Sequence, residues 1–172
     1  MTGVHLVSRG MGMAFGAFAV AAGLLIQEVS AQTEGDKPSG QTKVKKYHAP
    51  TAHRLVIQVD QNDKAVMDLA LNNAQDVMDY YKKRGEIVYL EIVTFGPGLH
   101  MLRSDTSPVR DRIAPMGLEH PNLTFIACGN TLANQIKAEG KSIKLMSEAK
   151  VVPSGVVRLM DLQKQGYAYI RP

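Results

Sequence analysis

A single cysteine, Cys128, stands in a sequence context that favours reactivity of its thiol. A β-rich run at 123–127 comes directly before it, and a predicted helix at 131–139 follows almost at once. A thiol at the start of a helix faces unsatisfied amides and the positive end of the helix dipole, which stabilise the thiolate and lower its pKa. A thiolate is the nucleophile needed to accept sulfur. The alternative is that Cys128 is a small buried hydrophobic residue at the end of a core strand.

The two polar residues after this cysteine, Asn130 and Thr131, are candidates for contact with a sulfur species bound at Cys128. Asn130 could donate its side-chain amide to such a species. Capping the helix is the commoner role for an asparagine just before a helix, and it is the one we expect.

A second candidate segment follows the predicted strand at 87–94. Gly96 and Gly98 would let the backbone approach a ligand closely, although a Gly-Pro-Gly sequence also simply forms a turn. His100 and Arg103 come next, and they could orient or attract an anion near Cys128 or else face solvent.

Other kinds of site lack support in the sequence. One cysteine excludes an internal disulfide and a multi-thiolate metal site held by one chain. His48, His53 and His120 are scattered, so no metal site is expected. The glycines at 96–98 lack the full phosphate-binding pattern, and no Gly-x-Ser-x-Gly hydrolase motif follows a strand. We therefore expect no cofactor.

The composition is that of one ordinary globular domain, with 172 residues, 45% hydrophobic residues and a formal net charge of +4. This excludes a multidomain assembly and a polytopic membrane protein. A polar segment at 32–52, with lysines at 43, 45 and 46, is predicted to be a flexible linker. These lysines lack interleaved aromatic residues and arginines, so we expect no nucleic-acid partner.

Residues 1–31 resemble a secretory signal peptide. The run from Met11 to Ile26 has no charge, and the segment ends in small residues, Val29-Ser30-Ala31. We expect cleavage after Ala31, a periplasmic or secreted mature chain, and no stable membrane insertion after cleavage. The alternative is an uncleaved membrane anchor, because Arg9 is the one certain cation before the apolar run.

The chain from residue 53 to the end alternates β-rich runs with amphipathic segments. Parallel strands require helical crossovers, so the pattern predicts an α/β three-layer sandwich built on a mainly parallel five-stranded sheet, with a flavodoxin-like strand order. The expected strands are 54–60, 87–94, 123–127, 150–152 and 167–171, and the expected helices are 63–83, 99–102, 109–116, 131–139 and 154–165.

Two of these helices have a predicted buried face. In the helix at 63–83, Asp63 is the expected N-cap, and spacings of three and four select Val66, Leu69, Ala70, Ala74, Val77 and Tyr81. In the helix at 154–165 the expected inward residues are Val156, Leu159 and Met160. Ligands of parallel sheets bind beyond the carboxyl ends of strands where the chain order reverses, which favours the segments at 96–98 and at Cys128.

Several of these segments resemble the DsrE/DsrF-like family with its YchN-like fold. The resemblance rests on the order of elements, the turn at 95–98 followed by Met101-Leu102, the junction at 125–131, and the closing segment at 166–172. It covers 53–172, taken as one domain of an exported member. It implies assembly into trimers or hexamers. It also implies a persulfide on Cys128, which matches the cysteine that several members use to carry sulfane sulfur.

Two functions from different classes follow. The first is a sulfur carrier or sulfurtransferase-like protein that acts through a Cys128 persulfide with a sulfur-donor or thiol partner protein. The second is a non-catalytic oligomeric module of the cell envelope that binds a ligand or a protein, with Cys128 as packing. Exposure of the Cys128 sulfur distinguishes them, and whether the protein is an enzyme stays open at this point.

Overall fold

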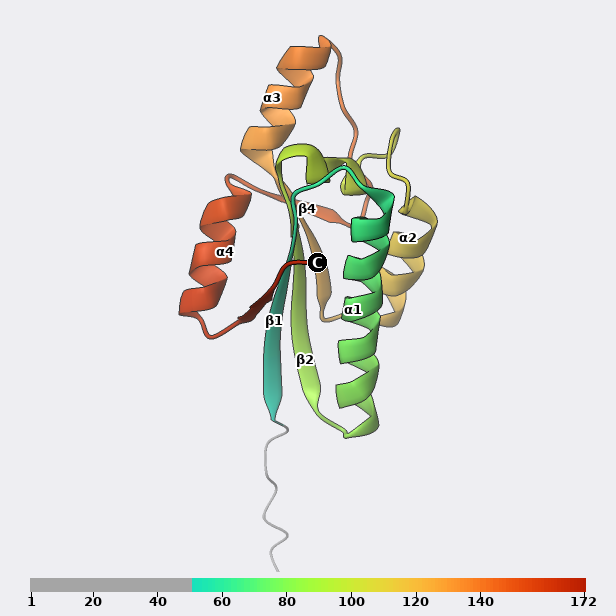
Figure 1. The fold of residues 1–172 in the computed structure, drawn as a ribbon, viewed down its shortest axis with the longest axis vertical. Helices are drawn as coiled ribbons and strands as arrows, with labels where there is room; N and C mark the ends of the chain where they lie inside the picture. The colour runs from blue at the N-terminus through green and yellow to red at the C-terminus, as the bar shows by residue number, and fades with distance from the viewer. Residues whose placement is uncertain (1–50) are drawn as a thin grey trace, which may run out of the picture. The chain divides into compact units, whose positions relative to one another are not determined.

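Strands and helices alternate throughout the part of the chain that the computed structural model describes, residues 51–172 (Figure 1). The predicted signal peptide at 1–31 and nearly all of the predicted linker at 32–52 lie outside the described residues. The elements are β1 (Ala52–Val59), α1 (Lys64–Lys83), β2 (Ile87–Thr94), the 3-10 helix η1 (Gly96–Leu102), α2 (Arg110–Glu119), β3 (Leu123–Cys128), α3 (Gly129–Glu139), β4 (Ala149–Val152), α4 (Gly155–Lys164) and β5 (Ala168–Ile170).

The five strands form one parallel sheet in the order β4-β3-β2-β1-β5. The predicted α/β fold class is therefore confirmed. The strand order differs from the flavodoxin-like order 2-1-3-4-5 that we expected by default. Each of β2, β3 and β4 lies beside the strand that precedes it in the chain. Helix α4 then connects β4 to β5, which lies on the other side of β1. Alternation of strands and helices predicts parallel pairing, but it does not specify which strands become neighbours.

The two faces of the sheet are covered unequally. Helices α1 and α2 pack with η1 on one face, and α4 packs on the other (Figure 1). Successive side chains of a strand point to opposite faces, so β1 contributes Leu55 and Ile57 to the first core and Val56 to the second. The first core is much the larger of the two, so more of the surface on the α4 side stays exposed.

Helix α1 begins as the sequence predicts but buries a slightly different face. The side chain of Asp63 accepts hydrogen bonds from the backbone amides of the first turn, which confirms the predicted N-cap. Leu69, expected in the core, is 46% exposed, whereas Met67 and Leu71 are fully buried. The buried face of the helix is therefore formed by Met67, Ala70, Leu71, Ala74 and Met78, of which Ala70 and Ala74 were predicted.

Helix α4 buries a narrower stripe than the sequence predicts. Leu159 is buried as expected, and its partner in the core is Leu162. Val156 and Met160 were expected to face inward, but each is about half exposed. The core beneath α4 is small, and the buried residues of the helix are Gly155, Leu159 and Leu162, which lie along one narrow stripe.

Candidate functional site

Cys128 is the last residue of β3 and the N-cap of α3, which confirms its predicted place at a strand-to-helix junction. It pairs with Val152, the last residue of β4. Parallel neighbours end at the same edge of a sheet, so the helices that follow β3 and β4 both begin beside this cysteine. Cys128 itself is 5% exposed.

The surroundings of the Cys128 sulfur stabilise its thiolate. Burial raises the pKa of the thiol, but hydrogen bonds from the Thr131 hydroxyl and from the backbone amides of Gly155, Thr131 and Asn130 lower it by more. The pKa therefore lies below its ordinary value. These donors come from the first turns of two helices, α3 and α4. Converging backbone amides of this kind form a site suited to a negative charge.

Gly155 is the residue of this site that the sequence prediction missed. A Cβ atom at this position would lie 3.2 Å from the Cβ of Cys128 and 3.2 Å from the ring and Cβ of Phe95. Glycine thus lets the first turn of α4 approach the sulfur closely. The available signal was the Pro153-Ser154-Gly155 turn, which follows a predicted strand in the same way as the segment at Cys128 does.

The predicted helix cap at Asn130 is wrong. Helix α3 begins at Gly129, so Asn130 lies within its first turn, and the N-cap position belongs to Cys128. The reason is that β3 passes directly into α3 without the short loop that we expected. The backbone amide of Asn130 also donates to the carbonyl of Pro153, at 3.1 Å, and so ties α3 to the loop before α4.

Thr131 and Gly96, which the sequence suggested separately, are joined in the structure. The backbone amide of Gly96 donates to the hydroxyl of Thr131 at 3.0 Å, and that hydroxyl in turn donates to Cys128. Gly96 has a φ of 53°, in the left-handed region that favours glycine. The turn after β2 therefore holds the Thr131 hydroxyl in position to donate a hydrogen bond to the Cys128 sulfur.

Gly98 and His100 lie against other parts of the chain. A Cβ atom on Gly98 would lie 2.2 Å from the carbonyl oxygen of Val59, so this glycine lets η1 pack on the end of β1. The Nδ1 atom of His100 lies 2.8 Å from the hydroxyl of Thr106. Neither residue is among the groups that lower the pKa of Cys128.

Arg103 has carboxylate partners within the chain itself. Its side chain is 1% exposed, and all five of its N–H donors are used by Asp105, Gln135 and Glu139. The sequence left two roles open for Arg103, attraction of an anion to Cys128 or exposure to solvent, and the structure shows neither, because the buried charge is already paired with Asp105 and Glu139. Arg103 instead binds helix α3, through Gln135 and Glu139.

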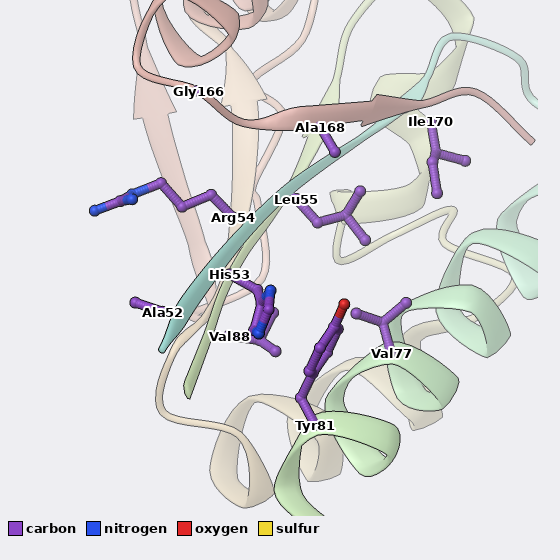
Figure 2. Close-up of a pocket in the computed structure, with 10 residues that line it drawn as sticks. All are labelled: Ala52, His53, Arg54, Leu55, Val77, Tyr81, Val88, Gly166, Ala168 and Ile170. Carbon is purple, nitrogen blue, oxygen red and sulfur yellow. The ribbon is translucent and has the colours of Figure 1, made fainter. Parts of the chain in front are cut away.

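A separate pocket of about 400 Å³ lies between β1, β5 and α1 (Figure 2). The ring of His53 stacks on that of Tyr81 with centroids 3.7 Å apart, while the side chain of Arg54 points away from the pocket. The pocket lies beside the start of β1, because β5 pairs only with Leu55–Ile57 and leaves Ala52–Arg54 without a partner on that edge of the strand. It lies at the opposite end of the parallel sheet from Cys128, and its lining contains no residue of the predicted site.

Two kinds of feature are absent from residues 51–172. In this part of the chain no helix has both the length and the apolar character needed to cross a membrane. The same residues contain no group of three or more His, Cys, Asp and Glu side chains placed to hold a metal ion.

Comparison with known proteins finds similarity among solved structures. No protein-family model matches the chain, and no curated protein matches it significantly. Among solved structures, the chain is similar to MTH1491 from Methanobacterium thermoautotrophicum, which is described as a protein of unknown function. The two are 30% identical with a TM-score of 0.58, and the alignment covers 70% of this chain and 99% of that one.

Proposed function

This chain belongs to the family of the Methanobacterium thermoautotrophicum protein MTH1491, and we propose that it acts as a sulfur carrier or sulfurtransferase-like protein through a persulfide on Cys128. The observation that carries this proposal is the convergence of two helix N-termini and one hydroxyl on a single thiol. A cysteine that served only to fill the core would gain nothing from such donors.

The proposed reaction moves one sulfur atom between thiolates. The Cys128 thiolate attacks the outer sulfur of a donor persulfide, R–S–SH, and a new sulfur–sulfur bond forms as the donor's own sulfur–sulfur bond breaks. The donor leaves as R–S⁻ with the electron pair of the broken bond, and the proton stays on the transferred sulfur. One thiolate replaces another, so no external oxidant or reductant is needed.

The hydrogen-bond donors around the Cys128 sulfur assist both steps, the uptake of sulfur and its release. Before transfer they stabilise the attacking thiolate, and after transfer the same donors face the sulfur that must leave when the persulfide is passed on. A leaving thiolate of lower pKa departs faster. The small exposed fraction of Cys128 restricts access, so we propose a donor that presents its transferable sulfur at the end of a narrow chain.

The reactivity of Cys128 in the folded protein tests this proposal. The rate of alkylation by iodoacetamide should rise with pH and level off above the thiol pKa, because only the thiolate reacts. Since the hydrogen bonds lower the pKa of Cys128, we expect the midpoint to lie below that of an ordinary cysteine thiol. Incubation with inorganic polysulfide should then add the mass of one sulfur atom to Cys128, as read by intact-protein mass spectrometry.

The same experiment distinguishes the second function, a non-catalytic oligomeric module that binds a ligand or protein. The burial of Cys128 and the pocket at the opposite end of the sheet are the observations that favour it. If iodoacetamide labels Cys128 only after denaturant is added, the thiol is inert packing and the binding module replaces the sulfur carrier.

We also propose that the protein assembles into a homo-oligomer. Helix α4 leaves apolar side chains about half exposed at Val156, Val157 and Met160, and β4 exposes Val151 at the edge of the sheet. Burying them against a second copy would remove apolar surface from water. Light scattering should give a mass of several chains, and Met160→Glu should lower it. A single-chain mass for the unmodified protein at micromolar concentration would contradict the proposal.

A further inference from the structure

Helix α3 is attached to the rest of the fold mainly by polar contacts. None of its residues is buried, although Leu132 packs partly against the larger core. Thr131, Gln135 and Glu139 are spaced by four residues and form one stripe along the helix. Two of them contact the first residue of η1, since the backbone amide of Gly96 donates to Thr131 and its carbonyl accepts from Gln135. The other end of the stripe meets Arg103.

Arg103 binds this stripe with the whole of its guanidinium group. Nη1 donates to Gln135 at 3.2 Å and to Glu139, and Nη2 donates to Glu139 at 3.0 Å. Nε and Nη2 form a fork with the carboxylate of Asp105, at 2.9 and 2.8 Å. We refer to Arg103, Asp105, Gln135 and Glu139 as the Arg103 cluster.

The two carboxylates of the Arg103 cluster are balanced by Arg103 together with a neighbouring lysine, Lys141. Hydrogen bonds from Arg103 hold the pKa of both Asp105 and Glu139 below their usual values, so both stay charged at neutral pH. Lys141 lies 3.6 Å from Asp105 and 3.5 Å from Glu139 and adds a second positive charge. A buried arginine that loses its carboxylate partner leaves an uncompensated charge, so the cluster strongly favours the docked position of α3.

We propose that Arg103 is a positioning residue for the Cys128 thiolate, because the cluster fixes α3 along η1 so that its first turn meets the sulfur. The inference rests on the proposed function in taking Cys128 as a reactive thiol. An α-helix rises about 1.5 Å per residue, so Glu139 lies about 12 Å along the axis from Thr131. A short helix transmits a tilt at one end to the other, and loss of the cluster therefore moves the donors away from the sulfur.

Substitutions at both partners test this inference. Arg103→Met removes every hydrogen bond of the cluster, while Arg103→Lys keeps the charge but loses the planar fork. Glu139→Gln keeps the size of the side chain and gives up its charge, so it provides a milder variant if Arg103→Met fails to fold. The matched control is Arg112→Met, because Arg112 also joins two helices, through Asp68 and Asn72 of α1, but makes no hydrogen bond or ion pair with α3 or α4 in the described residues.

The measurement is the alkylation rate of Cys128 against pH, with folding checked by circular dichroism. We expect the midpoint to move to higher pH in Arg103→Met, with alkylation at pH 7 up to about tenfold slower, since one pKa unit is a tenfold change in thiolate. Arg103→Lys and Glu139→Gln should show intermediate shifts, and Arg112→Met none.

The outcomes separate the two proposals. If the unmodified protein already has an ordinary thiol midpoint, the proposed function fails. If the unmodified protein has a low midpoint and the folded Arg103 and Glu139 variants keep it, the proposed function stands and the role of Arg103 as a positioning residue is overturned. An equal shift in Arg112→Met would also overturn it, because the effect would then come from general loosening of the fold.

Discussion

Replacing Cys128 by serine is expected to abolish the uptake of sulfur from polysulfide while leaving the fold intact. A hydroxyl at this position cannot form a persulfide, so intact-protein mass spectrometry should find no added sulfur. The serine oxygen can accept hydrogen bonds from the same amides of Asn130, Thr131 and Gly155 that face the sulfur. No buried donor is left without an acceptor, and the free energy of unfolding should fall by no more than about 2 kcal/mol.

The matched chemical control is the protein of unchanged sequence in which Cys128 has been alkylated. This protein should also take up no sulfur. Urea unfolding followed by circular dichroism gives the stability of Cys128→Ser. Sulfur that still adds to the folded serine variant would show that another group accepts it, and the proposed function would fail. A variant that does not fold would show that the thiol is primarily a packing residue.

Replacing Gly98 by alanine is expected to cause the largest loss of stability of any single substitution considered. The new Cβ would lie 2.2 Å from the carbonyl oxygen and 2.6 Å from the carbonyl carbon of Val59, and 2.8 Å from the Cα of Asp60. These are backbone atoms that cannot swing aside, so η1 must move away from the end of β1. We expect the free energy of unfolding to fall by about 3 kcal/mol or more, as measured by urea denaturation.

Gly117→Ala provides the matched control for this prediction. A Cβ at Gly117, within α2, would make ordinary contacts at 3.6 Å or more, and alanine is the better helix former. This variant should therefore be as stable as the unmodified protein or more stable by up to about 1 kcal/mol. A Gly98→Ala protein within about 1 kcal/mol of the unmodified one would show that η1 is not tightly held on β1.

Features that depend on neighbours in the chain could be predicted from the sequence. Asp63 caps α1 as expected, β2 covers the predicted range 87–94, and Gly140 ends α3 in the left-handed conformation that glycine favours. Cys128 belongs to this group, because its place between a strand and a helix follows from the residues on either side. The backbone of a short segment is governed by its own residues, so such features are visible in the sequence.

Features that join distant segments could not be predicted. The amide of Gly155 reaches Cys128 because β3 and β4 are neighbours, and nothing in the alternation of elements specifies that pairing. Arg103 was a candidate either to attract an anion or to face solvent, but it is buried against carboxylates of the same chain, one of which, Glu139, is 36 residues away. The buried faces of α1 and α4 were displaced for the same reason, since the shape of the partner surface decides which apolar residues are covered.

The pairing of β5 with β1 has a consequence for the nascent chain. Tyr169 donates to Gln58 and Arg171 pairs with Asp60, each contact spanning 111 residues, so this edge of the sheet forms through some of the longest-range contacts in the fold. Such contacts form slowly, because a long loop must close first. During synthesis β1 emerges from the ribosome before the other strands of the sheet, yet its outer edge has no partner until 168–170 have emerged. An unpaired strand edge is a template for association with other chains. Among the strand edges that are paired in the folded sheet, this one waits longest for its partner during translation.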